Sequence, residues 1–186
     1  MSVKPSRYAP GSDLQMWNDT EIPLAIFFTF RCYGTWLHGD ERGSVDRNNN
    51  VYRTARIQSN SNWKKFTRDT LLHPPLTLNA EQRKSVEHAI RDTCSKRNWT
   101  IYAINVRTNH VHVIICIGAK KPKTALIALK ANATRQLRED GLWNEDHTPW
   151  ADKGSKRNLW NEKSIGEAID YVINGQGDKL PDFDWW

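Results

Sequence analysis

Two histidines at alternate positions of an apolar segment are the residues of this chain best suited to chemistry. They are His110 and His112 in RTNHVHVIIC, residues 107–116. The β-branched residues around them predict a strand. Both side chains then point to one face, with Cα atoms about 7 Å apart. Two imidazoles in this arrangement can bind one metal ion, although a polar pair on a solvated sheet face would show the same spacing.

A second group of reactive side chains lies near the end of the chain. The sequence SIGEAIDYVINGQGD, residues 164–178, predicts an amphipathic helix. At 100° per residue, Tyr171 lies more than about 100° from the centre of the apolar face. Its phenol is therefore either a nucleophile or a surface residue at the helix edge. Asn174 and Gln176 beside it can bind a metal ion or cap the helix end.

The rest of the chain predicts the sheet that would hold these groups. Asn79 and Gln82 form a capping-box pattern before a helix, and Pro122 suits the first turn of another. A tight turn at 107–109 predicts an antiparallel hairpin. In chain order, the expected elements are a strand at 24–33, a helix at 80–96, a strand at 99–106, the histidine strand, a helix from Pro122, a strand at about 156–160 and a helix from near Ser164.

This order predicts an α+β fold, the ferredoxin-like split βαβ arrangement with an antiparallel sheet and an appended C-terminal helix that carries the tyrosine. Helices should cover one face of the sheet and leave the other available to a ligand, with the histidines on a central strand. Residues 52–76 show no clear pattern. A short hairpin is expected within residues 141–160.

The length of 186 residues favours a single domain with a real core. We expect a flexible N-terminal arm at residues 1–20, one domain at 21–180 and a tail at 181–186. Three widely separated cysteines without a C-x-x-C pair indicate neither a disulfide framework nor a cysteine zinc site. No signal peptide or membrane-spanning run is recognisable, so we expect a cytoplasmic protein that does not bind membranes.

The charge balance suits a polyanionic partner without proving one. The chain has 27 Lys and Arg against 21 Asp and Glu, a net charge of +6. Two basic segments are predicted to contact nucleic acid, although most basic faces are simply solvated. The candidate residues are Lys120, Lys121, Lys123, Lys130, Arg135 and Arg138 on the helix from Pro122 and its approach, with Arg42 and Arg47 in the first long loop.

These motifs together resemble a known family. NHVHVII resembles the His-hydrophobic-His motif of the HUH endonuclease superfamily. TFRCYGTWLHGD, together with the late helical tyrosine, resembles the single-tyrosine transposases, including the REP-associated tyrosine transposases. The resemblance runs from about Ile26 to Gln176. It implies an enzyme that cuts and rejoins single-stranded DNA, often next to a hairpin, as a monomer or a homodimer.

The resemblance also implies a role for each site residue. His110 and His112 match the metal ligands, and Tyr171 matches the nucleophile that forms a 5′-phosphotyrosine. Relatives carry a Gln or Asn four residues after the tyrosine, where this chain has Gly175. We expect Gln176 to replace it, because glycine lets the chain turn there; Asn174 is the alternative. The expected ion is Mg²⁺ or Mn²⁺.

A different class of function fits much of the same pattern. A non-catalytic module that binds single-stranded nucleic acid can use a ferredoxin-like sheet and a basic helix. A transposase that kept DNA binding and lost cutting belongs to this class. Such a module would not need Tyr171 as a nucleophile.

Overall fold

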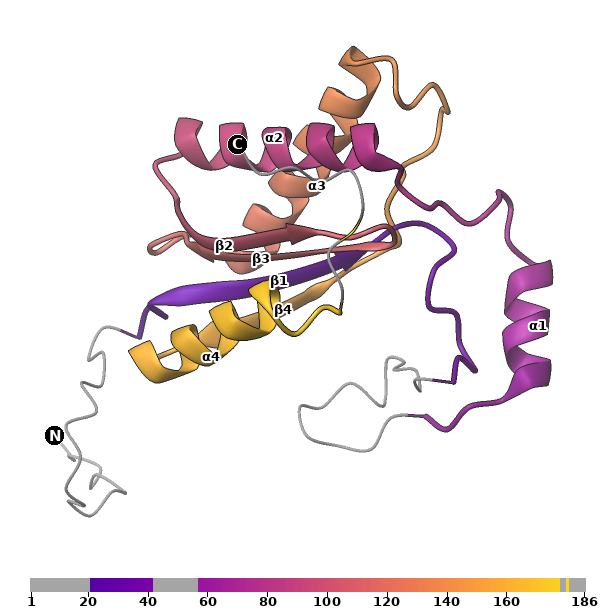
Figure 1. Cartoon of the computed structure of the whole chain (residues 1–186), viewed down its shortest axis with the longest axis horizontal. Helices are drawn as coiled ribbons and strands as arrows, with labels where there is room; N and C mark the ends of the chain where they lie inside the picture. Colours follow the sequence, from indigo (N-terminus) through magenta and orange to yellow (C-terminus); the bar gives the residue numbers. More distant parts are fainter. Residues whose placement is uncertain (1–20, 42–56, 178–179, 181–186) are drawn as a thin grey trace, which may run out of the picture.

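The computed structural model describes residues 21–41, 57–177 and 180. These residues form strands and helices in the predicted order, with one additional helix between the first strand and the capped helix (Figure 1). The elements are β1 (Ala25–Arg31), α1 (Ser61–Asp69), α2 (Ala80–Lys96), β2 (Thr100–Val106), β3 (His110–Cys116), α3 (Pro122–Glu139), β4 (Ser155–Leu159) and α4 (Glu162–Ile173).

The sheet has the ferredoxin-like topology that the sequence predicts. Its four strands lie in the order β2-β3-β1-β4, and all neighbours are antiparallel. The histidine strand β3 is therefore central, between β1 and β2. Thr29 of β1 and Asn105 of β2 are the register partners of His112 on either side. The predicted α+β fold class is confirmed.

The two faces of the sheet pack against different helices. Phe28, Phe30 and Val113 belong to the larger core, which α2 and α3 cover. Phe27 and Ile114 point the other way and pack against buried residues of α4. Figure 1 shows α2 and α3 on one side of the sheet and α4 on the other. The face expected to be left to a ligand is thus partly covered by α4.

Capping residues set where two of the helices begin. Asn79 Oδ1 accepts from the backbone N–H of Gln82 at 2.8 Å, and Gln82 Oε1 accepts from that of Asn79 at 3.0 Å, which confirms the predicted capping box of α2. Asn161 caps α4 in the same way through Ser164. The helix therefore starts at Glu162, two residues before Ser164, because Ser164 is the third helical residue and not the first.

Two parts of the chain differ from the prediction. Helix α1 begins after its N-cap Asn60 and buries none of its residues, so it has no apolar period to reveal it. The hairpin expected within 141–160 is wrong. Trp150 pairs with Cys32 in an isolated bridge and β4 pairs with β1. The Trp150 ring is 1% exposed, and its Nε1 donates to the carbonyl oxygen of Lys130, which holds this segment against α3.

Several predictions fall on residues outside this description. They are the arm at 1–20, the tail at 181–186, and Arg42 and Arg47. Within the described ranges, none of the helices has the length and apolar character needed to cross a membrane.

Candidate active site

The two histidines of β3 lie side by side on the face that α4 partly covers. Their ring centroids are 4.6 Å apart and the rings are nearly perpendicular. His112 is only 6% exposed, whereas His110 is half-buried. A solvated sheet face would leave both rings in water. Here His112 is enclosed by its neighbours and His110 is partly enclosed.

Nδ1 of each ring is hydrogen-bonded to a neighbouring side chain. Nδ1 of His112 is hydrogen-bonded to Thr29 Oγ1 at 2.8 Å, and Nδ1 of His110 donates to Asn109 Oδ1 at 2.6 Å. Thr29 reaches His112 because the two residues are register partners. A partner on one ring nitrogen fixes the orientation of the imidazole and leaves the other nitrogen for a ligand. Nε2 is therefore the ring nitrogen on the side of Gln176.

The surroundings of His112 favour its neutral form. Burial and, to a smaller extent, the neighbouring His110 lower the pKa of His112, and a hydrogen bond with Gln176 partly opposes them, so that the pKa is about 3. Removing a charged imidazolium from water is costly, so the buried ring stays unprotonated near neutral pH. Only a neutral imidazole can donate a lone pair to a metal ion.

Gln176 reaches the histidines from the end of α4. Its Nε2 donates to the carbonyl oxygen of Tyr171 at 3.1 Å, which turns Oε1 toward His110 Nε2 at 3.3 Å. This contact is a hydrogen bond when Nε2 of His110 carries a proton. When Nε2 carries none, the same two atoms could both bind a cation, so Gln176 and His110 are candidate metal ligands.

Asn174 is directed elsewhere. Its Nδ2 donates to Asp170 Oδ1 at 2.8 Å, one turn back on the exposed side of α4. Of the two amides that the sequence left open, the structure brings Gln176 to the histidines.

A Cβ at Gly175 would lie 2.8 Å from the carbonyl oxygen and 2.9 Å from Cδ2 of Tyr171. Gly175 does not have a positive φ, so the glycine is needed for close approach to the tyrosine.

Tyr171 lies next to His112 and Phe27. Its ring centroid lies 5.6 Å from that of His112 and 6.1 Å from that of Phe27, and the residue is 47% exposed. The phenol of Tyr171 therefore lies outside the apolar face of α4, as predicted, and next to the histidine strand. Asn105 Nδ2 donates to the carbonyl oxygen of Val172 at 2.8 Å, which fastens this end of α4 to β2.

The donor set fits a divalent cation. It comprises two imidazole nitrogens and one amide oxygen, from His110, His112 and Gln176. Such a set could hold Mg²⁺ or Mn²⁺. The described residues contain no cluster of three or more His, Cys, Asp or Glu side chains able to hold a metal. Among these residues, Gln176 is the side chain that adds a third donor beside the two histidines.

Comparison with known proteins supports the interpretation of the sequence. Residues 76–163 match the family described as Transposase IS200-like. Over this segment, the match agrees with the resemblance to transposases that the sequence motifs indicate. The matched segment contains both histidines and ends before Tyr171, so the tyrosine and Gln176 rest on the geometry described above.

Solved structures of transposases show weaker likeness. A REP-associated tyrosine transposase bound to a REP hairpin has 14% identity and a TM-score of 0.45, over 89% of this chain and 70% of that one. A candidate transposase from Deinococcus radiodurans R1 has 13% identity and a TM-score of 0.42, over 93% and 97%. Likeness at this level supports no further conclusion. No curated protein matches the chain.

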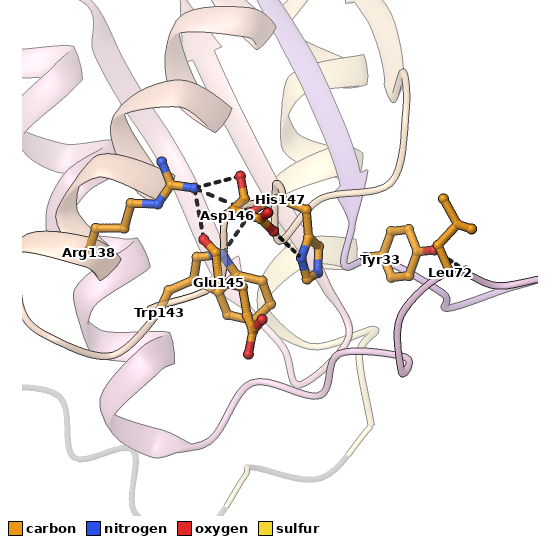
Figure 2. A network of polar contacts seen from close by, with 7 residues as sticks. All are labelled: Tyr33, Leu72, Arg138, Trp143, Glu145, Asp146 and His147. Carbon is orange, nitrogen blue, oxygen red and sulfur yellow. Dashed lines mark hydrogen bonds and ion pairs between the residues drawn. The ribbon is translucent and has the colours of Figure 1, made fainter.

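The basic residues predicted on α3 lie away from the histidine site. Lys130 Nζ donates to the carbonyl oxygens of Ala151 at 2.7 Å and Lys153 at 3.0 Å. Arg138 donates to the carbonyl oxygens of residues 145–147, which holds that loop against the helix (Figure 2). Arg135 is exposed and lies 3.5 Å from Glu139.

Lys120, Lys121 and Lys123 are exposed at the start of α3. They follow the end of β3 that is farther from His110, and α3 packs on the opposite face of the sheet. DNA contact by this basic segment therefore stays a prediction, and a DNA strand at the histidines would not reach α3 across the same face.

The sequence analysis did not identify the residues that surround the histidines. Thr29, Arg31 and Arg157 point to the site face from β1 and β4, as the pairings with His112, His110 and Phe27 show. The alternation in AIFFTFR, residues 25–31, indicates that Thr29 and Arg31 share a face. Only the strand register reveals that this is the face of the histidines.

Proposed function

We propose that this chain is a metal-dependent single-strand DNA endonuclease and strand transferase, a transposase that uses Tyr171 as its nucleophile. One observation supports this above all. The amide oxygen of Gln176, at the end of α4, lies 3.3 Å from Nε2 of His110 on β3, and the Tyr171 ring lies beside His112. Groups from two distant segments meet where a nucleophile and a phosphate-binding cation would both be needed.

The nucleophile needs assistance. A phenol with a pKa of about 10 is only about 0.1% ionised at neutral pH. Half-exposed Tyr171 can meet a phosphodiester from solvent. A divalent ion held by His110, His112 and Gln176 would offset the charge of the scissile phosphate and orient it. The working ion is Mg²⁺ or Mn²⁺, and the nitrogen donors favour Mn²⁺.

The reaction balances without an external energy source. The Tyr171 oxygen attacks phosphorus and loses its proton, and a 5′-phosphotyrosine bond forms. The bond to the 3′ oxygen breaks, and that oxygen leaves as a 3′-hydroxyl after taking up a proton. Because one phosphodiester replaces another, the same hydroxyl, or one from another strand, can reverse the step and reseal the DNA.

The substrate class follows from the family match and the charge. An IS200-like transposase segment and a net charge of +6 both suit DNA. We propose single-stranded DNA that carries a hairpin near the cleaved bond as the partner. One domain within residues 21–180 holds the whole site, and the active form is a monomer or a homodimer.

The test is formation of a covalent adduct. A labelled single-stranded hairpin DNA is incubated with the protein and Mn²⁺, and denaturing electrophoresis separates any protein-DNA adduct. We expect an adduct that EDTA prevents and that Tyr171→Phe abolishes while DNA binding persists. Tyr102→Phe is the matched control, because Tyr102 is 43% exposed against 47% for Tyr171 but lies on β2.

The opposite outcome would identify a different class of protein. Tight binding without any adduct, across hairpins of varied stem, loop and flanking sequence, would contradict the proposed chemistry. It would favour the non-catalytic nucleic-acid-binding module.

A further inference from the structure

The site face of the sheet carries two cationic side chains, Arg31 on β1 and Arg157 on β4. The pairing of Arg31 with His110 and of Arg157 with Phe27 places both on this face. No other Lys or Arg of the four described strands points there, because Lys156 pairs with Phe28 and faces the other way. The strand positions of this face contain no Asp or Glu. An anion at the histidines would therefore meet only these two strand charges.

Arg157 contacts the ring of Phe27, which is itself a neighbour of the proposed nucleophile. Its guanidinium carbon is 5.4 Å from the ring centroid of Phe27. The Phe27 centroid in turn lies 5.3 Å from that of His112 and 6.1 Å from that of Tyr171. Nε of Arg157 is buried and has no hydrogen-bond partner among the described residues. A buried donor on a cation is costly without an acceptor, which a phosphate oxygen would supply.

Arg31 lies beside His110, its register partner on β3. Its guanidinium carbon is 3.9 Å from the ring centroid of Trp36. Trp36 has a φ of 56°, an uncommon conformation for a bulky residue. The flat contact orients the guanidinium plane, and a preorganised guanidinium loses less freedom when it binds an anion. Arg31 and Trp36 both belong to the TFRCYGTWLHGD segment singled out in the sequence.

The two arginines flank His112 along β1. Phe27, beside Arg157, and Arg31 are four residues apart, about 13 Å on a strand. Thr29, the partner of His112, lies midway between them. We propose that Arg31 and Arg157 bind backbone phosphates on either side of the scissile one, so that single-stranded DNA lies along β1. This inference rests on the proposed function and names the DNA-contacting residues of that site.

The salt dependence of binding tests this directly. Affinity for a fluorescein-labelled single-stranded hairpin DNA is measured by anisotropy over a series of salt concentrations. Each lost phosphate contact to a single strand lowers the slope of log K against log salt by about 0.7. We expect Arg31→Gln and Arg157→Gln each to lower the slope by about this amount and the double variant by about twice as much. Both should also reduce adduct yield.

Lys156→Gln is the matched control. It removes one positive charge from the residue next to Arg157, on the opposite face of β4. Its slope should change by clearly less than that of Arg157→Gln. Equal changes in the two variants, or unchanged slopes in both arginine variants, would overturn the proposal, because the arginines would then act only through net charge or by packing on Phe27 and Trp36.

A second measurement uses the unaltered protein. Bound DNA should protect Arg31 and Arg157 from phenylglyoxal, read by mass spectrometry, and leave exposed Arg135 reactive. Because this measurement needs no variant, it tests the proposed arginine–DNA contacts even if Arg157→Gln does not fold. Unprotected arginines in a protein that still forms the Tyr171 adduct would refute the DNA path alone. A protein that neither binds the DNA nor forms an adduct would refute both this inference and the proposed function.

Discussion

Thr29 orients the imidazole ring of His112. The ring is buried and its Nδ1 is engaged by the Thr29 hydroxyl at 2.8 Å, so Nε2 is the nitrogen left for a metal ion. Thr29 itself contacts neither the proposed substrate nor the nucleophile. It is a positioning residue that acts through the imidazole.

Replacing Thr29 by Val should weaken metal binding. The substitution keeps the shape of the side chain and removes the hydroxyl that orients His112. We expect the Mn²⁺ concentration for half-maximal adduct formation to rise by roughly 10- to 100-fold, with the adduct yield restored at high Mn²⁺. Thr29→Ser keeps the hydroxyl and should behave nearly as the wild type. If Thr29→Val has an unchanged Mn²⁺ requirement, Thr29 does not position His112 for metal binding.

The individual residues show what a sequence can reveal about a site. The alternate spacing of His110 and His112 predicts a shared face from the two-residue period of a strand alone, and the angle of Tyr171 predicts its departure from the core stripe. Thr29 could not be assigned to them, because its contact with His112 depends on the register between strands 83 residues apart in the chain. Asn109 is adjacent to His110, but asparagine is common in turns, so the residue type alone does not predict its hydrogen bond to His110.

At the scale of elements, Gly175 controls how α4 delivers Tyr171 and Gln176. A Cβ at this position would meet backbone and ring atoms of Tyr171 at 2.8 and 2.9 Å. Gly175→Ala should therefore displace the phenol or Gln176 and slow adduct formation by about 100-fold, the usual effect of a misplacement near 1 Å. Binding of the labelled DNA should be unchanged, because neither arginine moves.

Gly166→Ala in the same helix is the control. Gly166 is exposed, and a Cβ there would meet nothing within 4 Å. Alanine should raise the free energy of unfolding by about 0.5–1 kcal/mol through helix propensity alone. Adduct formation should be retained. If Gly175→Ala cleaves at the wild-type rate, then close approach to Tyr171 is not needed at this position.

Asn105 should fasten the functional end of α4 to the sheet. Its side-chain N–H group donates to the carbonyl oxygen of Val172, next to Tyr171. Asn105→Ala removes this hydrogen bond, and we expect the free energy of unfolding to fall by about 1 kcal/mol in urea titrations. Adduct formation should fall as well, because the tyrosine is no longer held over β3. Full activity with reduced stability would limit Asn105 to a structural role.

The elements differ in how far sequence patterns predicted them. Helix α2 has both an apolar period and a capping box, and its bounds were predicted to the residue. Helix α1 buries no side chain, so neither signal was present beyond its N-cap. The sequence predicts a local hairpin in the segment before β4, but Trp150 of this segment pairs with Cys32 instead. The buried ring instead hydrogen-bonds α3, a contact that only the tertiary structure defines.

For the whole molecule, a cation at this site would join the central strand to the last helix. His110 and Gln176 come from elements 66 residues apart. An ion that binds the folded state alone stabilises it by about 2.7 kcal/mol at a hundredfold excess over its Kd. We expect Mn²⁺ to raise the thermal unfolding temperature of the wild type and to have little effect on His110→Ala. His88→Ala, which alters an exposed histidine of α2, should keep the Mn²⁺ response. An equal Mn²⁺ effect in all three proteins would place the ion elsewhere.

The most direct measurement is to locate the covalent bond. The adduct formed with hairpin DNA and Mn²⁺ is trimmed by nuclease, digested with protease and sequenced by mass spectrometry. We predict a single nucleotide-bearing peptide that contains residues 164–177, with the 5′ phosphate on the oxygen of Tyr171. A phosphate on any other residue, Tyr102 or Tyr33 included, would contradict the assignment of the nucleophile and of the site built around it.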